Sequence, residues 1–181
     1  MRSILPADEN PALRDISRAL SAAEIISPKI KKFISEMKKL LAAEKYGVAL
    51  AAVQVGEPVR LFIVSGRALS RGGRNAADEP DKKDEAAIPL PDSVFINPAL
   101  TKLSRKKIDK HEGCLSIRGK WGEVPRAEKA TLTFIDEHGK TQTRGASGFL
   151  AHIFQHEMDH LEGVLYTDKA TAVYDEQPEQ K

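Results

Sequence analysis

The chain has 181 residues, and 28 Lys and Arg against 26 Asp and Glu give a formal net charge of +2. One domain typically takes about 150 residues, so we expect residues 1–181 to form a single domain with its own buried core. The near balance of charge argues against a broadly basic nucleic-acid-binding protein. No apolar run approaches the ~20 residues of a membrane span, which argues against a transmembrane protein.

The start of the chain and its cysteine content argue against a secreted protein. Asp8 and Glu9 appear before any long apolar run, so we expect no secretory signal peptide. Cys114 is the only cysteine, and a single cysteine forms no internal disulfide. Together these features predict a protein of a reducing compartment.

The first predicted element is an N-terminal helix from residue 28 to about residues 45–47. Ser27 suits the N-cap and Pro28 the first helical position. Apolar residues then recur at the spacing of one helix face, at Ile30, Ile34, Met37 and Leu41. Residues 59–64 (VRLFIV) predict a strand. The charged, Gly- and Pro-containing stretch that follows predicts a mobile insertion within the domain at about residues 66–92.

Short strands dominate the second half of the prediction. We expect them near residues 94–98, 106–110, 129–136 and 141–144, with a hairpin turn at residues 137–140. A helix over residues 148–161 follows and is closed by Gly163. This order favours an α+β fold with antiparallel or mixed sheets around a central C-terminal helix. The polar residues 169–181 predict a frayed tail.

The most informative pattern lies in that C-terminal helix and reads His156-Glu157-Met158-Asp159-His160. Residues four apart lie one turn above each other, so His156 and His160 can hold one metal ion between them. Glu157 places a carboxylate beside that ion. A pair of His152 and His156 is the alternative, but only the later pair has a glutamate at its second position. The alternative without a functional role is a solvent-exposed helix face that happens to carry two histidines.

A catalytic metal site needs a third protein ligand and one position left open for water. Cys114 is a candidate, because Gly113 before it allows close backbone approach and a metal would keep the sulfur as thiolate. A lone cysteine is by default a small buried hydrophobe. Spacing alone leaves both interpretations of Cys114 open.

Three segments in this order resemble the motifs of the peptide deformylases. Residues 112–116 (EGCLS) match the second motif of that family, and residues 155–160 (QHEMDH) match the third. Residues 47–54 (GVALAAVQ) resemble the first, Gly-φ-Gly-φ-Ala-Ala-x-Gln, where φ is an apolar residue. The Ile96-Asn97-Pro98 and Val124-Pro125-Arg126 segments agree as well, so the resemblance extends over about residues 5–168.

The resemblance implies a metal-dependent hydrolase that removes the formyl group from the formylmethionine at the N-terminus of new polypeptides and releases formate. It implies one divalent ion per chain, Fe²⁺ in the cell with Zn²⁺ or Ni²⁺ able to replace it, held by Cys114, His156 and His160. Glu157 would be the acid/base of the reaction. The Gln54 side chain and the Leu115 backbone N–H would stabilise the oxyanion.

The resemblance also implies a substrate-binding set. The methionine side chain would enter a slot lined by Val48, Phe149, His152 and Ile153, and the peptide backbone would be positioned by Glu112 and Gly113. The sequence departs from the family at Ala49, which stands where the first motif has glycine; a methyl group there narrows the cleft if the substrate approaches it. The Ile-Pro that is common after the second motif is replaced by Ile117-Arg118.

N-formylmethionyl peptides and nascent chains are the implied partners. Some bacterial members dock on the ribosome through a basic C-terminal helix, whereas this tail contains Asp175, Glu176 and Glu179. We therefore expect action near the ribosome without docking by the tail, and no direct binding of nucleic acid or membranes. A bacterial-type cytoplasm is the expected location, with an organelle as the alternative.

Two other functions stay open from the residues alone. A zinc metallopeptidase can share the His-Glu-x-x-His pattern, but it typically takes its third ligand downstream, where no histidine follows His160. A metal-binding module that has lost catalysis is the second alternative. Glu157 and Gln54 argue against it, because a purely structural site normally has four protein ligands and no use for an adjacent base.

Overall fold

The structure, a computed structural model, describes residues 2–70 and 90–175. The first described part contains the 3-10 helix η1 (Pro11–Arg14), α1 (Ala22–Ile25), α2 (Pro28–Ala43), β1 (Ala49–Ala51), the 3-10 helix η2 (Ala52–Val55), β2 (Leu61–Val64) and α3 (Gly66–Ser70). The second contains β3 (Ser93–Leu103), β4 (Lys107–Cys114), β5 (Ile117–Ala127), β6 (Lys129–Ile135), β7 (Thr141–Ser147), α4 (Gly148–Leu161), α5 (Tyr166–Lys169) and β8 (Ala172–Asp175).

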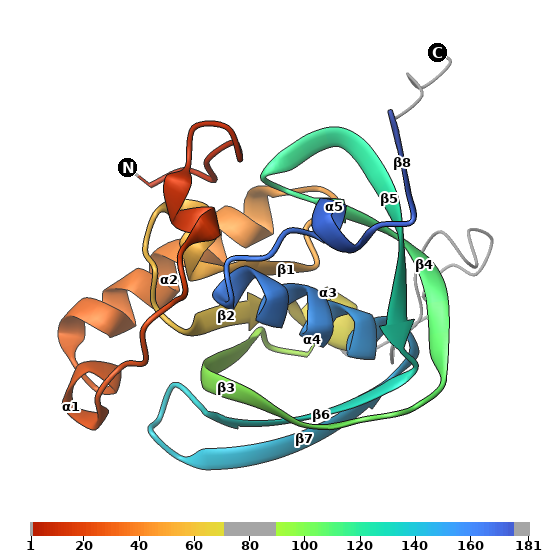
Figure 1. Cartoon of the computed structure of the whole chain (residues 1–181). Helices are drawn as coiled ribbons and strands as arrows, with labels where there is room; N and C mark the ends of the chain where they lie inside the picture. Colours follow the sequence, from red (N-terminus) through yellow and green to blue (C-terminus); the bar gives the residue numbers. More distant parts are fainter. Residues whose placement is uncertain (1, 71–89, 176–181) are drawn as a thin grey trace.

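The strands form two antiparallel sheets around α4. One sheet has five strands in the order β1-β2-β3-β6-β7, and the other has three in the order β4-β5-β8. Figure 1 shows α4 in the middle of the molecule, with strands of both sheets around it and α2 at one side. The predicted α+β fold with a central C-terminal helix is therefore confirmed.

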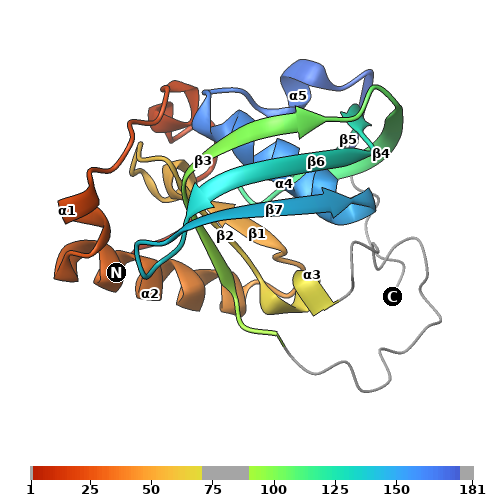
Figure 2. The same ribbon diagram turned by 90° about the horizontal axis from the view of Figure 1, so that it is seen from below.

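The five-stranded sheet is covered on both faces, which explains the unbroken apolar sequence of β2. Leu61 and Ile63 pack into the cluster that contains the buried face of α2. Phe62 and Val64 point the other way, into the cluster that contains α4. Strands buried on both sides need apolar residues at every position. Figure 2 shows β3, β6 and β7 side by side across α4, so this sheet holds the helix in place.

Several predicted elements are confirmed, and others are longer than predicted. The helix over residues 148–161 is α4, and Gly163 beyond its end has a positive φ of 72°. The hairpin turn at residues 137–140 joins β6 to β7. The N-terminal helix ends earlier than predicted, at Ala43. Strand β5 was not predicted, because Gly119, Gly122 and Pro125 interrupt its pattern.

The expectation of a frayed tail from residue 169 is wrong as far as residue 175. Residues 172–175 form β8, which pairs with β5 from Lys120 to Glu123. Short α5 precedes it and buries Tyr166. Backbone pairing gives this short segment an ordered place, although Val173 and Tyr174 stay exposed. The rest of the predicted tail, residues 176–181, lies outside the described residues.

Most of the predicted insertion, residues 71–89, also lies outside the described residues. Its first part was predicted as irregular but forms α3. The N–H of Gly66 donates to the Asp92 carboxylate at 2.8 Å, and a Cβ on Gly66 would overlap the Leu90 carbonyl. The two described ends of the insertion therefore meet, and glycine is needed where they touch.

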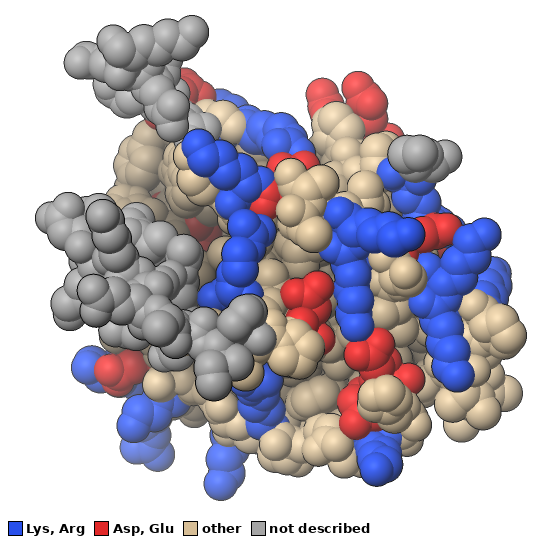
Figure 3. All heavy atoms as spheres, turned by 180° about the vertical axis from the view of Figure 1, so that it is seen from behind, with Lys and Arg blue, Asp and Glu red and all other residues tan. Residues whose placement is uncertain are grey.

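The surface carries both signs of charge. On the face opposite to that of Figure 1, Lys and Arg side chains are interspersed with Asp and Glu (Figure 3), in keeping with 28 basic against 26 acidic residues. Among the described residues, no helix combines the length and apolar character needed to cross a bilayer.

Candidate metal centre and active-site cleft

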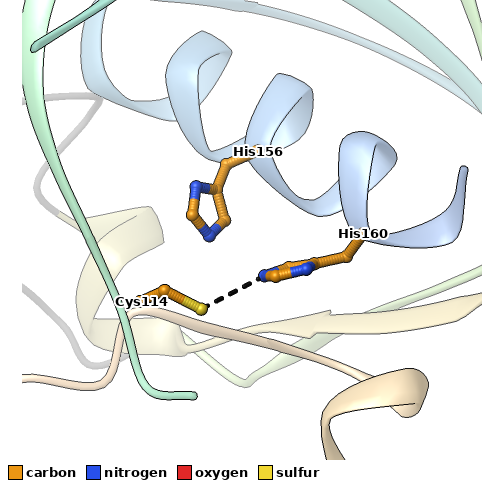
Figure 4. Close-up of side chains that lie close together, drawn as sticks. All are labelled: Cys114, His156 and His160. Carbon is orange, nitrogen blue, oxygen red and sulfur yellow. Dashed lines mark hydrogen bonds between the residues drawn. The ribbon is translucent and has the colours of Figure 1, made fainter. Parts of the chain in front are cut away.

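Three side chains with metal-binding atoms meet between α4 and the end of β4. His156 and His160 project from one face of α4 toward Cys114 (Figure 4). The Cys114 Sγ lies 3.3 Å from His160 Nε2, and the potential ligand atoms of all three residues lie within 4.8 Å of one another. The structure thus brings together the histidine pair that the sequence favoured and the cysteine that spacing left open.

This group of atoms fits a divalent ion. Ligands about 2.3 Å (sulfur) and 2.1 Å (nitrogen) from one tetrahedral metal lie roughly 3.5 Å apart, close to the separation of Cys114 and His160. A thiolate with two neutral imidazoles suits Fe²⁺, Zn²⁺ or Ni²⁺ better than Mg²⁺ or Ca²⁺. Within residues 2–70 and 90–175, the cluster contains no fourth His, Cys, Asp or Glu. A four-coordinate ion held by these three residues would keep one position for water or substrate.

His156 is oriented by a buried carboxylate. Its Nδ1 lies 2.9 Å from Glu112 Oε2, which directs the Nε2 toward the ligand cluster. Arg126, only 3% exposed, donates to both Glu112 oxygens at 2.7 and 2.9 Å and also binds Asp159. Asp159 in turn accepts from Lys169 at 2.6 Å. This chain of charge pairs links β4, β5, α4 and α5 behind the metal ligands.

The electrostatics favour the charged forms of Glu112, Cys114 and His156. Burial lowers the pKa of His156, but its interactions with Cys114 and Glu112 raise that pKa well above its usual range, so a metal ion would have to displace a proton from this imidazole. Burial raises the pKa of Glu112, but the hydrogen bonds of Arg126 and His156 outweigh it and lower that pKa to about 2. Burial likewise raises the pKa of the Cys114 thiol, yet the neighbouring imidazoles of His160 and His156 bring it well below its usual range. A thiolate forms readily here, and the thiolate is the metal-binding form.

Glu157 is a carboxyl group kept out of water beside the cluster. It is 4% exposed, and its Oε2 has no hydrogen-bond partner among the described residues. Burial raises the pKa of Glu157 above its ordinary value, against the opposing effect of His156 and His160. A carboxyl group with a raised pKa can both accept and return a proton near neutral pH.

Gln54 points an amide N–H₂ at the cluster from the first motif. Its Oε1 accepts from the Ala51 backbone N–H at 2.8 Å, which fixes the orientation of the amide. The Nε2 then faces Cys114 Sγ and Ser116 Oγ, both at 3.4 Å. The backbone N–H of Leu5 donates to Gln54 O and that of Ala7 to Ser116 O, so the N-terminal residues join the first and second motifs.

A cleft of about 420 Å³ opens beside the cluster. It is lined by twelve of the thirteen predicted site residues: Val48, Ala49, Gln54, Glu112, Gly113, Cys114, Leu115, Phe149, His152, Ile153, His156 and Glu157. The remaining one, His160, belongs to the ligand cluster but is buried and does not line the cleft. His152 contributes to the cleft wall, with Nδ1 3.9 Å from Glu112 Oε1, and lies apart from the ligand cluster.

Sequence reasoning missed part of the site. Arg126 was quoted only as part of a matching segment, although it holds Glu112 in place. Its neighbours Glu123 and Glu128 are charged, so no local pattern in the sequence marked Arg126 as buried. Other residues line the cleft without having been predicted as site residues, although Gly47 belongs to the first motif and Ile117-Arg118 to the departure after the second: Tyr46, Gly47, Ile117, Arg118, Gly119, Lys120 and Trp121.

The sequence model of one family, described as polypeptide deformylase, matches residues 1–176. The chain belongs to the peptide deformylase family. A peptide deformylase of Brucella suis biovar 1 (strain 1330) is 34% identical over 165 residues, which cover 91% of this chain and 81% of the relative. Chloroplastic peptide deformylase 1A of Solanum lycopersicum is 36% identical over 162 residues, or 88% of this chain and 56% of the relative.

Solved structures of deformylases share the fold. The Met-Ala-Ser-bound class I type b peptide deformylase of Acinetobacter baumannii has a TM-score of 0.78 at 29% identity, covering 93% of this chain and 98% of that chain. The actinonin complex of the Synechococcus elongatus enzyme has a TM-score of 0.75 at 29% identity, covering 94% and 79%. This chain is thus an enzyme of the deformylase family, a metal-dependent hydrolase that removes N-formyl groups from new polypeptides. The metallopeptidase alternative is set aside.

Proposed function

We propose that Cys114, His156 and His160 hold one divalent ion and that Glu157, Gln54 and Leu115 carry out deformylation around it. The juxtaposition of the three ligands with a buried carboxyl group of raised pKa carries this proposal. A divalent ion at this position supplies a Lewis acid that polarises the formyl carbonyl and makes water more acidic.

Glu157 is the proton carrier in this proposal. It accepts the proton of the attacking water and returns it to the α-amine as the bond between the formyl carbon and nitrogen breaks. Burial favours the neutral carboxyl group, which suits the second half of this cycle. Formate and a peptide with a free N-terminal methionine are the products.

Gln54 and the Leu115 backbone N–H stabilise negative charge on the formyl oxygen. The hydrogen bond that the Ala51 backbone N–H donates to Gln54 Oε1 holds the amide with its N–H₂ toward the ligand cluster before substrate arrives. Donors that need no reorientation are the ones that lower a reaction barrier most. Leu115 lines the same cleft directly after Cys114.

The methionine side chain occupies the apolar part of the cleft. Val48, Phe149 and Ile153 supply apolar walls, and His152 lies among them. Glu112 and Gly113 position the peptide backbone, and Ala49 narrows the cleft beside it. The similar enzyme of Acinetobacter baumannii was solved with Met-Ala-Ser bound, which supports a peptide of this kind as the product of the reaction.

We further propose Fe²⁺ as the ion used in the cell, with Zn²⁺ or Ni²⁺ able to replace it, since the sulfur and imidazole ligands accept all three. The family match over residues 1–176 supports a single catalytic domain. The substrates are N-formylmethionyl peptides and nascent chains. Bacterial and chloroplastic relatives support a bacterial-type cytoplasm or an organelle as the location.

The test is release of formate from formyl-Met-Ala-Ser by protein loaded anaerobically with Fe²⁺. We expect turnover by the parent and a fall in kcat of about 10²–10⁴-fold in Glu157→Gln, because a positioned proton carrier contributes that much. Metal content of both proteins is measured in parallel. A Glu157→Gln variant that binds metal and keeps full activity would contradict the role of Glu157. Inactivity of the metal-loaded parent would instead support a module that has lost catalysis.

A further inference from the structure

One segment of β5 leaves the regular pairing with β4 at the edge of the cleft. Glu112 is paired with Gly122 and Cys114 with Ile117, so residues 118–121 stand opposite the single residue Gly113. We call these four residues the lip. Bulges of this kind re-aim side chains next to active sites. All four lip residues line the cleft.

The lip combines an aromatic wall with two cations. The Trp121 ring lies against Gly113, where an added Cβ would come within 3.2 Å of it. The Arg118 and Lys120 side chains are 63% and 51% exposed. On its outer side the lip pairs with β8, from Lys120 to Asp175 and from Trp121 to Tyr174. Strand β8, which the sequence did not predict, thus supports the lip from outside.

Arg118 contacts the segment that leads to Tyr46 in the cleft wall. Its guanidinium donates to both oxygens of Glu44, at 2.7 and 3.3 Å. Glu44 directly follows α2 and stands two residues before Tyr46, which lines that wall. Glu44 itself does not line the cleft, whereas Arg118 does, so the cation is the member of this pair that a substrate carboxylate can meet. Lys120 has a corresponding exposed partner in Asp175, at 2.7 Å.

We propose that the lip selects substrates by charge, favouring formylmethionyl peptides whose second or third residue is acidic over those in which it is basic. The inference rests on the proposed function, because it places the residues after methionine between the lip and the wall at Tyr46. Arg118 uses two of its five N–H donors on Glu44, and Lys120 one of three on Asp175, so both cations keep donors for a substrate carboxylate.

The expected selectivity is moderate. An exposed ion pair changes an equilibrium constant by up to about fivefold and is weakened by salt. A basic residue loses this attraction and meets repulsion from the same cations. We therefore expect kcat/KM to differ by about tenfold between Asp and Lys peptides at low ionic strength, and the difference to shrink in 0.5 M salt to about twofold.

The experiment compares formyl-Met-Ala-Xaa-amide and formyl-Met-Xaa-Ser-amide, with Asp, Asn or Lys at Xaa, using Fe²⁺-loaded full-length protein. The C-terminal amide removes a carboxylate that would obscure the effect. Arg118→Gln should reduce the Asp/Lys ratio, whereas Glu44→Gln should increase it by freeing Arg118. Lys106→Gln is the matched control, because Lys106 is an exposed cation paired with Glu128 at 3.1 Å outside the cleft, and its ratio should equal that of the parent.

The outcomes separate the two proposals. Turnover of the Asn peptides with equal rates for Asp and Lys in both series would overturn the selectivity and leave deformylation standing. An equal loss of the ratio in Lys106→Gln and Arg118→Gln would also overturn it, since overall charge would then explain the effect. Failure of the metal-loaded parent to process any of these peptides would overturn the proposed function and the selectivity together.

Discussion

The two sheets of this molecule hold α4 in different ways. The five-stranded sheet does so with apolar side chains, such as Phe95 and Leu132, which are fully buried against the helix. The Phe95 ring stacks on Phe62 with centroids 4.7 Å apart and meets Phe154 of α4 edge-on at 5.2 Å. The three-stranded sheet instead contributes Glu112 and Arg126, a buried ion pair.

This difference suggests that one sheet mainly stabilises the fold and the other mainly positions the metal ligands. Apolar packing is non-directional and tolerates small shifts, whereas a bidentate ion pair fixes angles as well as distances. The five-stranded sheet therefore supports the helix, and the three-stranded sheet aligns what the helix presents to the ligand cluster. A buried ion pair stabilises a fold less than well-packed apolar residues of the same volume, so alignment of His156 is the better reason for this pair.

The largest effect should come from breaking the ion pair. Arg126→Met leaves the Glu112 carboxylate buried without its partner, and we expect the free energy of unfolding to fall by about 3–5 kcal/mol. Because Glu112 then no longer orients His156 firmly, metal affinity should fall about 10–100-fold. Denaturant unfolding and competition with a chelator measure the two quantities.

Replacing both partners tests whether the loss of stability in Arg126→Met comes from the missing ion pair or from the unpaired buried charge. In the double variant Glu112→Leu and Arg126→Met, stability should return toward that of the parent while metal affinity stays low. Recovery of metal affinity in this double variant would contradict the assignment of Glu112 as the group that orients His156.

A smaller and different effect is expected from the five-stranded sheet. Leu132→Ala removes a fully buried side chain from the cluster around α4, and we expect unfolding to require about 2–4 kcal/mol less. Metal affinity of the folded protein should stay within about threefold of the parent. Changes at sites that share no contacting partners act independently, so a cavity at Leu132 should not alter the ligand cluster. A loss of metal affinity as large as that of Arg126→Met would remove the distinction between the sheets.

Acidification should weaken the ion-paired region selectively. The Glu112 pKa is about 2 in the folded protein against an ordinary value of 4.5, so its contribution to stability is complete above pH 4.5 and is lost as pH falls toward 2. In metal-free protein, the difference in unfolding free energy between the parent and Glu112→Gln should narrow by about 1 kcal/mol from pH 6 to pH 3.5. A gap that widens over this range would mean that Glu112 is not stabilised as a carboxylate.

The difference between the sheets also explains what the sequence could predict. The buried strands β2 and β3 and the helix α4 follow from apolar pattern, capping residues and turn signals, which are local. The histidine pair was predictable for the same reason, since helical spacing alone places His156 and His160 together. Resemblance to a family supplied the roles of Cys114 and Gln54.

Non-local contacts are what the sequence could not provide. Strand β5 carries glycines and a proline, and its place is set by pairing with β4 and β8 over long sequence separations. Strand β8 is only four residues long, and it is ordered by that pairing together with contacts such as the Lys120–Asp175 ion pair. The Glu112–Arg126 pair likewise forms only once β4 and β5 are in register, so its residues gave no local sign of being partners.

The smallest predicted effect concerns Ala49, the departure from the family's first motif. Its methyl group lines the cleft on an edge strand of the five-stranded sheet. Ala49→Gly should destabilise the fold by about 0.5–1 kcal/mol, because glycine in a strand costs more conformational entropy. It should also raise kcat/KM for formyl-Met-Ala-Ser about fivefold, the lower end of what one crowding methyl group costs. Lower stability with unchanged kcat/KM would place this methyl group among the residues that only support the sheet.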